Sequence, residues 1–183
     1  MICVLKFNIT KKYFKRKMKE KLEQTKFIVG RFDTFIESTQ TKSNLYLALN
    51  TAILVGIITI AAATKPEDVT LFSLIVLGII ALLAVVSITL TLIAITPYLK
   101  SASDTSTSVI FFQDVANFTF EEYADKINTI SDKKFLLDLT CQAYSLAGGL
   151  KVKYQKLFYA GRIIIAEFVF LLIYLITLIT KFI

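Results

Sequence analysis

The stretch that decides the fold is LFSLIVLGIIALLAVVSITLTLIAIT, which runs from Leu71 to Thr96 without a charged side chain. An α-helix rises about 1.5 Å per residue, so about 20 apolar residues cross the hydrocarbon core of a bilayer. This stretch is long enough to do so. The rest of the chain decides whether it lies in a membrane or in the core of a soluble protein.

Two further apolar segments lie on either side of this stretch. Residues 45–63 (LYLALNTAILVGIITIAAA) carry no charge, and residues 163–180 (IIIAEFVFLLIYLITLIT) carry only Glu167. One such segment could be a buried core helix, but three in a chain of 183 residues predict three transmembrane helices. Residues 1–5 are too short for a signal peptide, and the basic residues follow them, so we expect the spans to be retained.

The composition agrees with a membrane protein and excludes several kinds of chemistry. Apolar residues make up 55% of the chain, whereas soluble domains average about 45–50%. The chain has no histidine and two cysteines, Cys3 and Cys141, which argues against His-based acid–base catalysis and Cys-rich zinc sites. The usual nucleophile and phosphate-loop motifs are also absent. We therefore expect no enzyme, no catalytic residue and no metal.

The positive charge is concentrated at the N-terminus. Residues 1–44 carry a net charge of +7, which is the net charge of the whole chain, while residues 64–70 carry −1 and residues 97–162 carry +1. Basic residues near membrane spans stay on the inner side. We therefore expect a cytoplasmic N-terminus, an external link at 64–70, a cytoplasmic region at 97–162 and an external C-terminus.

The sequence thus predicts an all-α membrane protein with a cytoplasmic helical bundle. Its segments are a basic amphipathic helix at 1–43, a transmembrane hairpin at 44–96 with spans at 45–63 and 71–96, a cytoplasmic helical region at 97–162 and a third span at 163–183. The amphipathic helix covers residues 9–43 and has one apolar face. That face consists of Phe14, Met18, Leu22, Val29, Phe32 and Ile36.

The basic run between these apolar positions, from Lys11 to Lys21, has three interpretations. It can attract anionic lipids, each basic residue contributing about 1 kcal/mol near the surface, or it can act as a topology signal on a solvated helix face. Nucleic-acid binding is the weakest reading, because no recognisable binding module surrounds the run.

Several short patterns predict where helices begin and end. Residues 64–68 (TKPED) are typical of a helix start with Pro66 at the first helical position, and Pro97 ends or kinks the second span. Thr119 and Glu122 match a capping box, so a helix begins near Thr119 and is broken at 128–131.

A long helix is then expected from Ser131 into the third span, since no proline interrupts it before Thr180. Gly148 and Gly149 are its weak point and a possible hinge. Its apolar seam has nearly heptad spacing, which suits packing against another helix. The seam consists of Leu136, Leu139, Ala143, Leu146, Leu150, Tyr154 and Leu157.

Four polar residues are expected at or near membrane depth: Asn44, Asn50, Thr51 and Glu167. Ionisable side chains inside a bilayer are costly and usually face protein or water. We expect Glu167 to face the bundle interior and to hydrogen-bond Asn50 or Thr51; the alternative is that it snorkels to the interface.

Taken in order, these features resemble the transmembrane effectors of Pycsar, a bacterial anti-phage defence system, over roughly residues 35–180. The resemblance rests on a cytoplasmic helix leading into the first span, two spans with a very short link, a following proline, and a long helix running into the last span. The residues that carry it are 41–45 (TKSNL), Pro97, Phe111 and Phe112, Tyr123, Gln142, Leu146 and 153–157 (KYQKL).

The resemblance implies an effector that impairs the inner membrane when a partner pyrimidine nucleotide cyclase makes cyclic CMP or cyclic UMP, causing growth arrest or abortive infection. It implies no catalytic residue and no resident cofactor. From the residues themselves, Tyr144, Lys151, Lys153 and Tyr154 are candidates for binding the cyclic nucleotide, because a phosphate needs a cation and a base needs a stacking partner. The alternative for these residues is anchoring and seam packing.

The expected assembly is a homo-oligomer in the lipid bilayer, since three helices enclose little of a pore. Two other functions stay open. One is a holin-like or toxin-like pore former that needs no nucleotide, and the other is a membrane scaffold that recruits a partner through its cytoplasmic helices.

Overall fold

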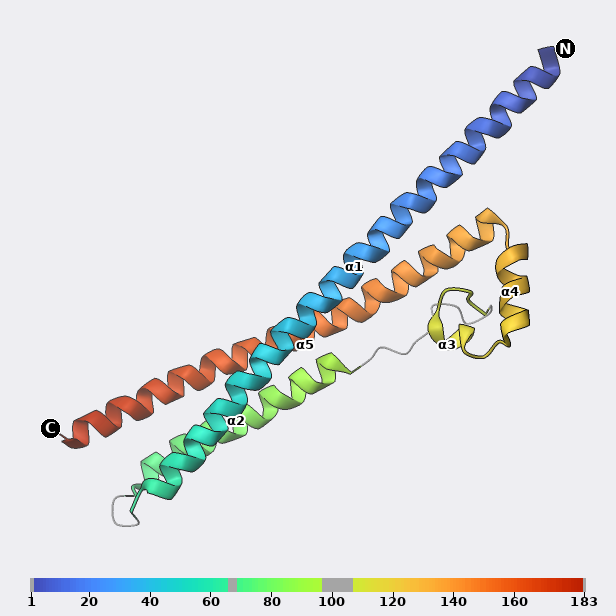
Figure 1. Ribbon diagram of the computed structural model, residues 1–183. Coiled ribbons are helices and arrows are strands. Elements are labelled where there is room, and N and C mark those ends of the chain that lie inside the picture. Colours follow the sequence, from blue (N-terminus) through green and yellow to red (C-terminus); the bar gives the residue numbers. More distant parts are fainter. Residues whose placement is uncertain (1, 66–68, 97–106, 183) are drawn as a thin grey trace. The chain divides into compact units, whose positions relative to one another are not determined.

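The computed structural model describes residues 2–65, 69–96 and 107–182, with side chains described from Lys15 to Thr180 inside those ranges. In this part of the chain every regular element is a helix (Figure 1). The helices are α1 (Ile2–Ala63), α2 (Leu71–Ile95), α3 (Phe112–Val115), α4 (Phe120–Thr129) and α5 (Asp132–Phe182). The predicted all-α class is confirmed.

The chain divides into two compact units. The head unit consists of Met1–Ile36 and Tyr98–Leu150, and the span unit consists of Glu37–Pro97 and Lys151–Ile183. Helices α1 and α5 each contribute to both units, while α2 belongs to the span unit alone. All three are long and apolar enough to cross a membrane, as the sequence predicts.

The two long helices are continuous. Helix α5 is helical through Gly148 and Gly149, so the predicted long helix is confirmed and the glycine pair does not interrupt it. Helix α1 likewise passes through residues 43 and 44, where the sequence placed a segment boundary, because no proline or glycine interrupts it there. The division between the units falls on α5 directly after the glycine pair, at Leu150.

One heptad seam runs along α1 through both units. Residues at alternating spacings of three and four are half-buried or buried, which is the pattern of helices that wind around one another. The predicted apolar face is confirmed from Met18 to Ile36, while Phe14 lies outside the described side chains. The seam consists of Met18, Leu22, Thr25, Val29, Phe32, Ile36, Thr39, Ser43, Tyr46, Asn50, Ile53, Ile57 and Ile60.

Helix α5 carries the matching seam. Every residue of the predicted seam is half-buried or buried, with Leu139, Ala143 and Leu157 buried. With strict heptad spacing, the seam residue that follows Leu150 is Lys153, whereas the predicted seam has Tyr154 there. The seam then continues through the span unit as Leu157, Ala160, Ile164, Glu167, Leu171, Tyr174 and Leu178.

Helix α2 completes the span unit. Thr70 is its N-cap. The Thr70 hydroxyl accepts from the Ser73 backbone N–H, and the Thr70 backbone N–H donates to the Ser73 hydroxyl, which together form a capping box. The prediction that Pro66 opens this helix is therefore wrong, and Pro66 itself lies outside the described residues. The helix ends at Ile95 with Thr96 as C-cap, two residues before Pro97, which also lies outside the described residues.

Short helices complete the head unit, and their ends follow local sequence signals. Thr119 and Glu122 form the predicted capping box at the start of α4, and α4 ends at Thr129 inside the expected break. The carboxylate of Asp138 on α5 accepts from the Val109 backbone N–H at 2.9 Å. The Tyr123 hydroxyl donates to the Val109 carbonyl at 3.2 Å, so both side chains fix the segment before α3.

Candidate functional site

A layer of polar side chains crosses the interior of the span unit. The Asn50 amide donates to the Tyr46 carbonyl at 2.7 Å within α1 and to the Ser87 hydroxyl of α2 at 3.1 Å. The Ser87 hydroxyl in turn donates to the Ala160 carbonyl of α5 at 3.3 Å. These bonds join all three spans at one level. Tyr46, Asn50 and Ala160 lie on the seams of their helices, and Ser87 is buried on α2.

Glu167 lies on the same seam of α5, two helical turns beyond Ala160. Its side chain is 0% exposed, so it faces the interior, and the alternative of snorkelling to the interface is wrong. The predicted hydrogen bond to Asn50 or Thr51 is also wrong, because neither carboxyl oxygen has a partner among the described residues. The Asn50 carbonyl oxygen is likewise buried without a partner there.

The predicted set of intramembrane polar residues divides by helix face. Asn44 and Thr51 are exposed, whereas their neighbours Ser43 and Asn50 are buried on the seam. The structure adds Ser43 of α1 and Thr91 of α2 as further buried polar residues of the span unit. The heptad spacing continued from Ile36 was the signal that could have found Ser43.

An apolar cluster lies at the other end of the span unit. Val76 and Ile80 of α2 and Tyr174 of α5 form its buried centre, and isoleucines of α1 pack against them. Glu167 precedes Tyr174 on the seam by two turns and follows Ala160 by two turns. Its carboxyl group therefore lies between the polar layer and the apolar cluster along α5.

The proposed nucleotide-binding residues of α5 have different surroundings. Lys153 donates to the Ile95 carbonyl at 3.4 Å, and partial burial lowers its pKa. The Lys42 ammonium lies 5.3 Å from the centre of the Tyr154 ring, a cation–π contact. Tyr144 and Lys151 are exposed. Lys153 and Tyr154 thus already join helices at one end of the span unit.

A close helix contact lies near these residues. A Cβ placed on Gly161 of α5 would lie only 2.7 Å from the Tyr46 hydroxyl, so glycine at this position leaves room for the Tyr46 side chain. Gly148, the residue proposed as a hinge, has open space around it, and helix α5 is unbroken there.

The head unit contains a cavity of about 740 Å³ that the sequence did not indicate. It lies where the end of α4 meets the start of α5, and its volume falls in the range of small-molecule sites, about 300–1,000 Å³. Its wall mixes two lysines, three hydroxyls, one carboxylate and apolar side chains. The lining residues are Thr107, Val109, Lys126, Thr129, Ile130, Ser131, Lys134, Leu137, Asp138 and Cys141.

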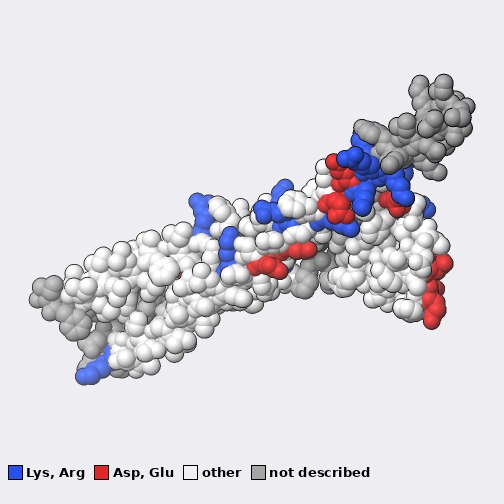
Figure 2. Space-filling model, turned by 45° about the horizontal axis from the view of Figure 1, so that its top comes forward, with Lys and Arg blue, Asp and Glu red and all other residues white. Residues whose placement is uncertain are grey.

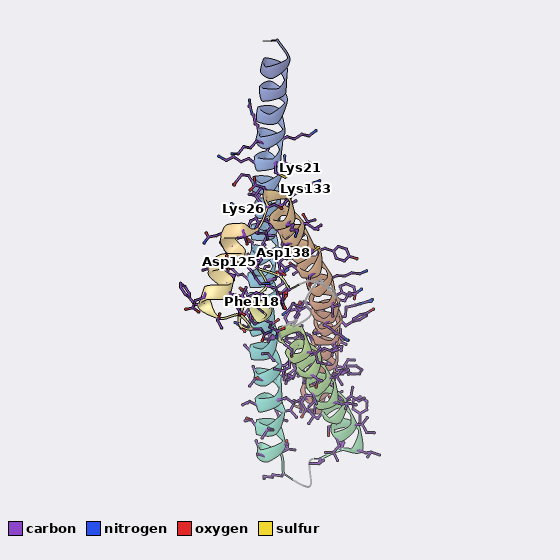
Figure 3. All side chains as sticks on the ribbon, turned by 90° about the vertical axis from the view of Figure 1, so that its right-hand side faces the viewer. Lys21, Lys26, Phe118, Asp125, Lys133 and Asp138 are labelled. Atoms are coloured by element: carbon purple, nitrogen blue, oxygen red, sulfur yellow. The ribbon has the colours of Figure 1, made fainter. Side chains whose placement is uncertain are left out.

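Lys126 of the cavity wall also contacts an aromatic pair. The Lys126 ammonium lies 4.4 Å from the centre of the Phe118 ring, and Phe118 stacks on Tyr123 at 6.4 Å between ring centres. Figure 3 labels Phe118, which precedes α4, and Asp138, which comes from α5. The cavity thus combines two cations with polar groups, and α5 begins at its edge with the acidic Asp132 in the first turn of the helix.

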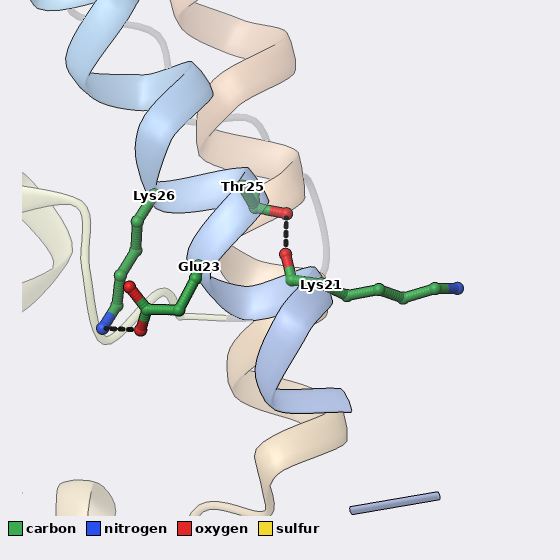
Figure 4. A network of polar contacts seen from close by, with 4 residues as sticks. All are labelled: Lys21, Glu23, Thr25 and Lys26. Carbon is green, nitrogen blue, oxygen red and sulfur yellow. Dashed lines mark hydrogen bonds and ion pairs between the residues drawn. The ribbon is translucent and has the colours of Figure 1, made fainter. Parts of the chain in front are cut away.

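Charged side chains are frequent on one half of the drawn surface, and the other half is nearly free of them (Figure 2). On α1 the Lys26 ammonium pairs with the Glu23 carboxylate at 3.2 Å, and the Lys21 side chain extends away from that pair (Figure 4). Both partners of the ion pair are exposed, so the pair contributes at most about 1 kcal/mol. Lys11 and Lys12 lie outside the described side chains.

The comparisons with known proteins agree with this architecture. In the part of the chain that the structure describes, no three His, Cys, Asp or Glu side chains gather as metal ligands do. A family model described as the Pycsar effector protein domain matches residues 24–180. No curated protein and no solved structure matches the chain. The match includes both units and all five helices, and it begins after the basic run at 11–21.

Proposed function

This chain belongs to the Pycsar effector protein family, and from that premise we propose that it impairs the integrity of the bacterial inner membrane when a partner cyclase makes cyclic CMP or cyclic UMP. The observation that carries the proposal is the joining of two units by continuous helices. The head unit holds a cavity for a small ligand, and α1 and α5 lead directly from that unit into the spans.

The same proposal includes topology and assembly. The N-terminus and the head unit lie in the cytoplasm, where the cyclase product is made, and the 64–70 link and the C-terminus lie outside. The active form is a homo-oligomer, because three spans enclose little of a pore. Growth arrest or abortive infection follows from the membrane damage.

The cavity of the head unit is the proposed place of the cyclic nucleotide. Lys126 and Lys134 supply charge for its single phosphate, and the hydroxyls of Thr129 and Ser131 supply hydrogen bonds to the ribose or the base. Asp138 is the acceptor that an exocyclic amine of cytosine would need.

The residues first predicted from the sequence, Tyr144, Lys151, Lys153 and Tyr154, form the second candidate place. Their supporting observation is that Tyr144 and Lys151 are exposed and accessible to a ligand. The contacts of Lys153 with Ile95 and of Tyr154 with Lys42 weigh against them, because a ligand would have to displace both.

Dye release from liposomes tests the function and the place together. We expect the reconstituted full chain to release dye on addition of cyclic CMP or cyclic UMP and to be silent without them. Lys126→Ala and Lys134→Ala should each raise the nucleotide concentration for half-maximal release about tenfold, since a charged hydrogen bond contributes about 1.5–3 kcal/mol. Lys133→Ala is the matched control, because Lys133 is exposed and does not line the cavity.

Other outcomes identify the other candidates. Lys151→Ala with the same tenfold loss, and unchanged cavity variants, would place the ligand on the later part of α5. Release without any nucleotide would indicate a holin-like pore former. A complete absence of release with either nucleotide would contradict membrane damage and favour a scaffold.

A further inference from the structure

Glu167 is the least explained group in the span unit. Within the apolar segments 45–63, 71–95 and 163–180 it is the only Asp, Glu, Lys or Arg residue. It is fully buried, and both of its carboxyl oxygens lack a partner among the described residues. A buried polar group without a hydrogen bond costs free energy, and an ionisable one at membrane depth usually marks a functional path. The packed state therefore does not satisfy this group.

The inward faces of the spans carry further buried polar side chains, on the Ala160 side of Glu167. On α1 the seam carries Ser43 and Asn50, and on α2 it carries Ser87 and Thr91, all buried. The outward faces of the same helices consist mainly of exposed leucine, isoleucine and valine. Among the described residues, the other polar group buried without a partner is the Asn50 carbonyl oxygen, also on the seam. Both groups accept hydrogen bonds, and both would gain partners from water or from a cation.

We propose that these inward faces line a water-filled passage in the activated assembly, and that the Glu167 carboxylates make this passage selective for cations over anions. This inference rests on the proposed membrane damage and states what kind of lesion it is. One Glu167 from each copy gives a set of carboxylates around the passage, which is how many cation channels exclude anions. No lysine or arginine lies in the three apolar segments to oppose that selectivity.

The structure shows the three spans packed together, which in this proposal is the closed state of the passage. The bond from Asn50 to Ser87 and the bond from Ser87 to the Ala160 carbonyl hold the three spans together at one level. Opening exchanges these bonds for bonds to water, a small cost for hydroxyl and amide groups. The apolar cluster of Val76, Ile80 and Tyr174 keeps the other end dry while the helices are packed.

Current through planar bilayers under a potassium chloride gradient tests the inference. The full chain is reconstituted and both cyclic CMP and cyclic UMP are added. For the wild type we expect potassium to be more permeant than chloride, so that the reversal potential moves toward the potassium equilibrium potential, as a carboxylate ring produces. Glu167→Gln should keep the current and bring this permeability ratio to about one, while Glu167→Asp should retain the preference.

Glu37→Gln is the matched control, because Glu37 is exposed and lies outside the three apolar segments; the variant should retain the wild-type ratio. A wild-type current that carries both ions equally, or a Glu167→Gln current that stays selective, overturns the inference while leaving the membrane damage intact. An absence of current with both nucleotides contradicts the proposed function itself. The potassium-to-chloride permeability ratio of the wild type tests the inference without any variant, so the test is valid even if Glu167→Gln does not insert into the membrane.

Discussion

The head unit and the span unit use the same two helices, with outward faces of opposite polarity. In the head unit the seam of α1 is mainly apolar, for example at Leu22 and Phe32, and most basic side chains point outward. In the span unit the seam carries Asn50 and Glu167, and the outward faces are apolar. The heptad spacing is common to both, because it depends on helix geometry. The polarity is reversed because the surrounding solvent changes from water to lipid.

Burial of seam side chains stabilises helix packing in different ways in the two units. In water, apolar seam residues stabilise helix packing because they leave the solvent. In lipid that driving force is absent, so packing depends on close contacts and on polar groups that find partners. The span unit shows both kinds of interaction: Tyr46 packs closely against Gly161, and the Ser87 hydroxyl hydrogen-bonds the Ala160 carbonyl.

The largest expected effect comes from placing a charge in the apolar cluster of the span unit. Ile80→Asp should abolish accumulation of inserted protein, because Ile80 is fully buried in the apolar cluster and a charge at the centre of a span costs about 2.5–3.5 kcal/mol. Protease protection in membrane vesicles measures insertion. Ile80→Val is the control, with an expected loss of about 1 kcal/mol and normal insertion. Normal insertion of Ile80→Asp would show that the cluster is hydrated.

The second prediction tests the seam of the head unit with two leucines of one helix. Leu139 is 7% exposed and Leu137 is 64% exposed. Leu139→Ala should lower the free energy of unfolding by about 2–5 kcal/mol, and Leu137→Ala should change it by less than about 0.5 kcal/mol. Thermal unfolding in detergent followed by circular dichroism measures both. Equal effects of the two variants would contradict the assigned seam.

The smallest expected effect concerns the polar layer. Ser87→Ala removes the acceptor of Asn50 and the bond to the Ala160 carbonyl, and such bonds in membranes average about 0.6 kcal/mol and reach about 1.7. Thr89→Ala is the control, because Thr89 is exposed and donates only to the Val85 carbonyl of its own helix. Steric trapping in bicelles measures these differences. A larger loss for Thr89→Ala would show that the layer does not join the spans.

Much of the fold follows from local patterns. The capping box of Thr119 and Glu122, the break before Ser131 and the seam of α5 are set by residues within a few positions of one another. The start of α2 shows where such signals compete. The acidic link with Pro66 resembles a helix start, but the reciprocal bonds of Thr70 and Ser73 fix the start at Leu71.

The sequence by itself determined the helical class, the three spans and the long helix α5, because hydropathy and helix signals are sums over neighbouring residues. The tertiary structure alone decided that Ser43 rather than Asn44 faces inward, that Ser87 takes the Asn50 amide, and that Glu167 is buried without a partner. Each residue turns a helix by about 100°, so a shift of one position changes the face. Which faces meet depends on helices far apart in the chain, and the head-unit cavity has the same origin.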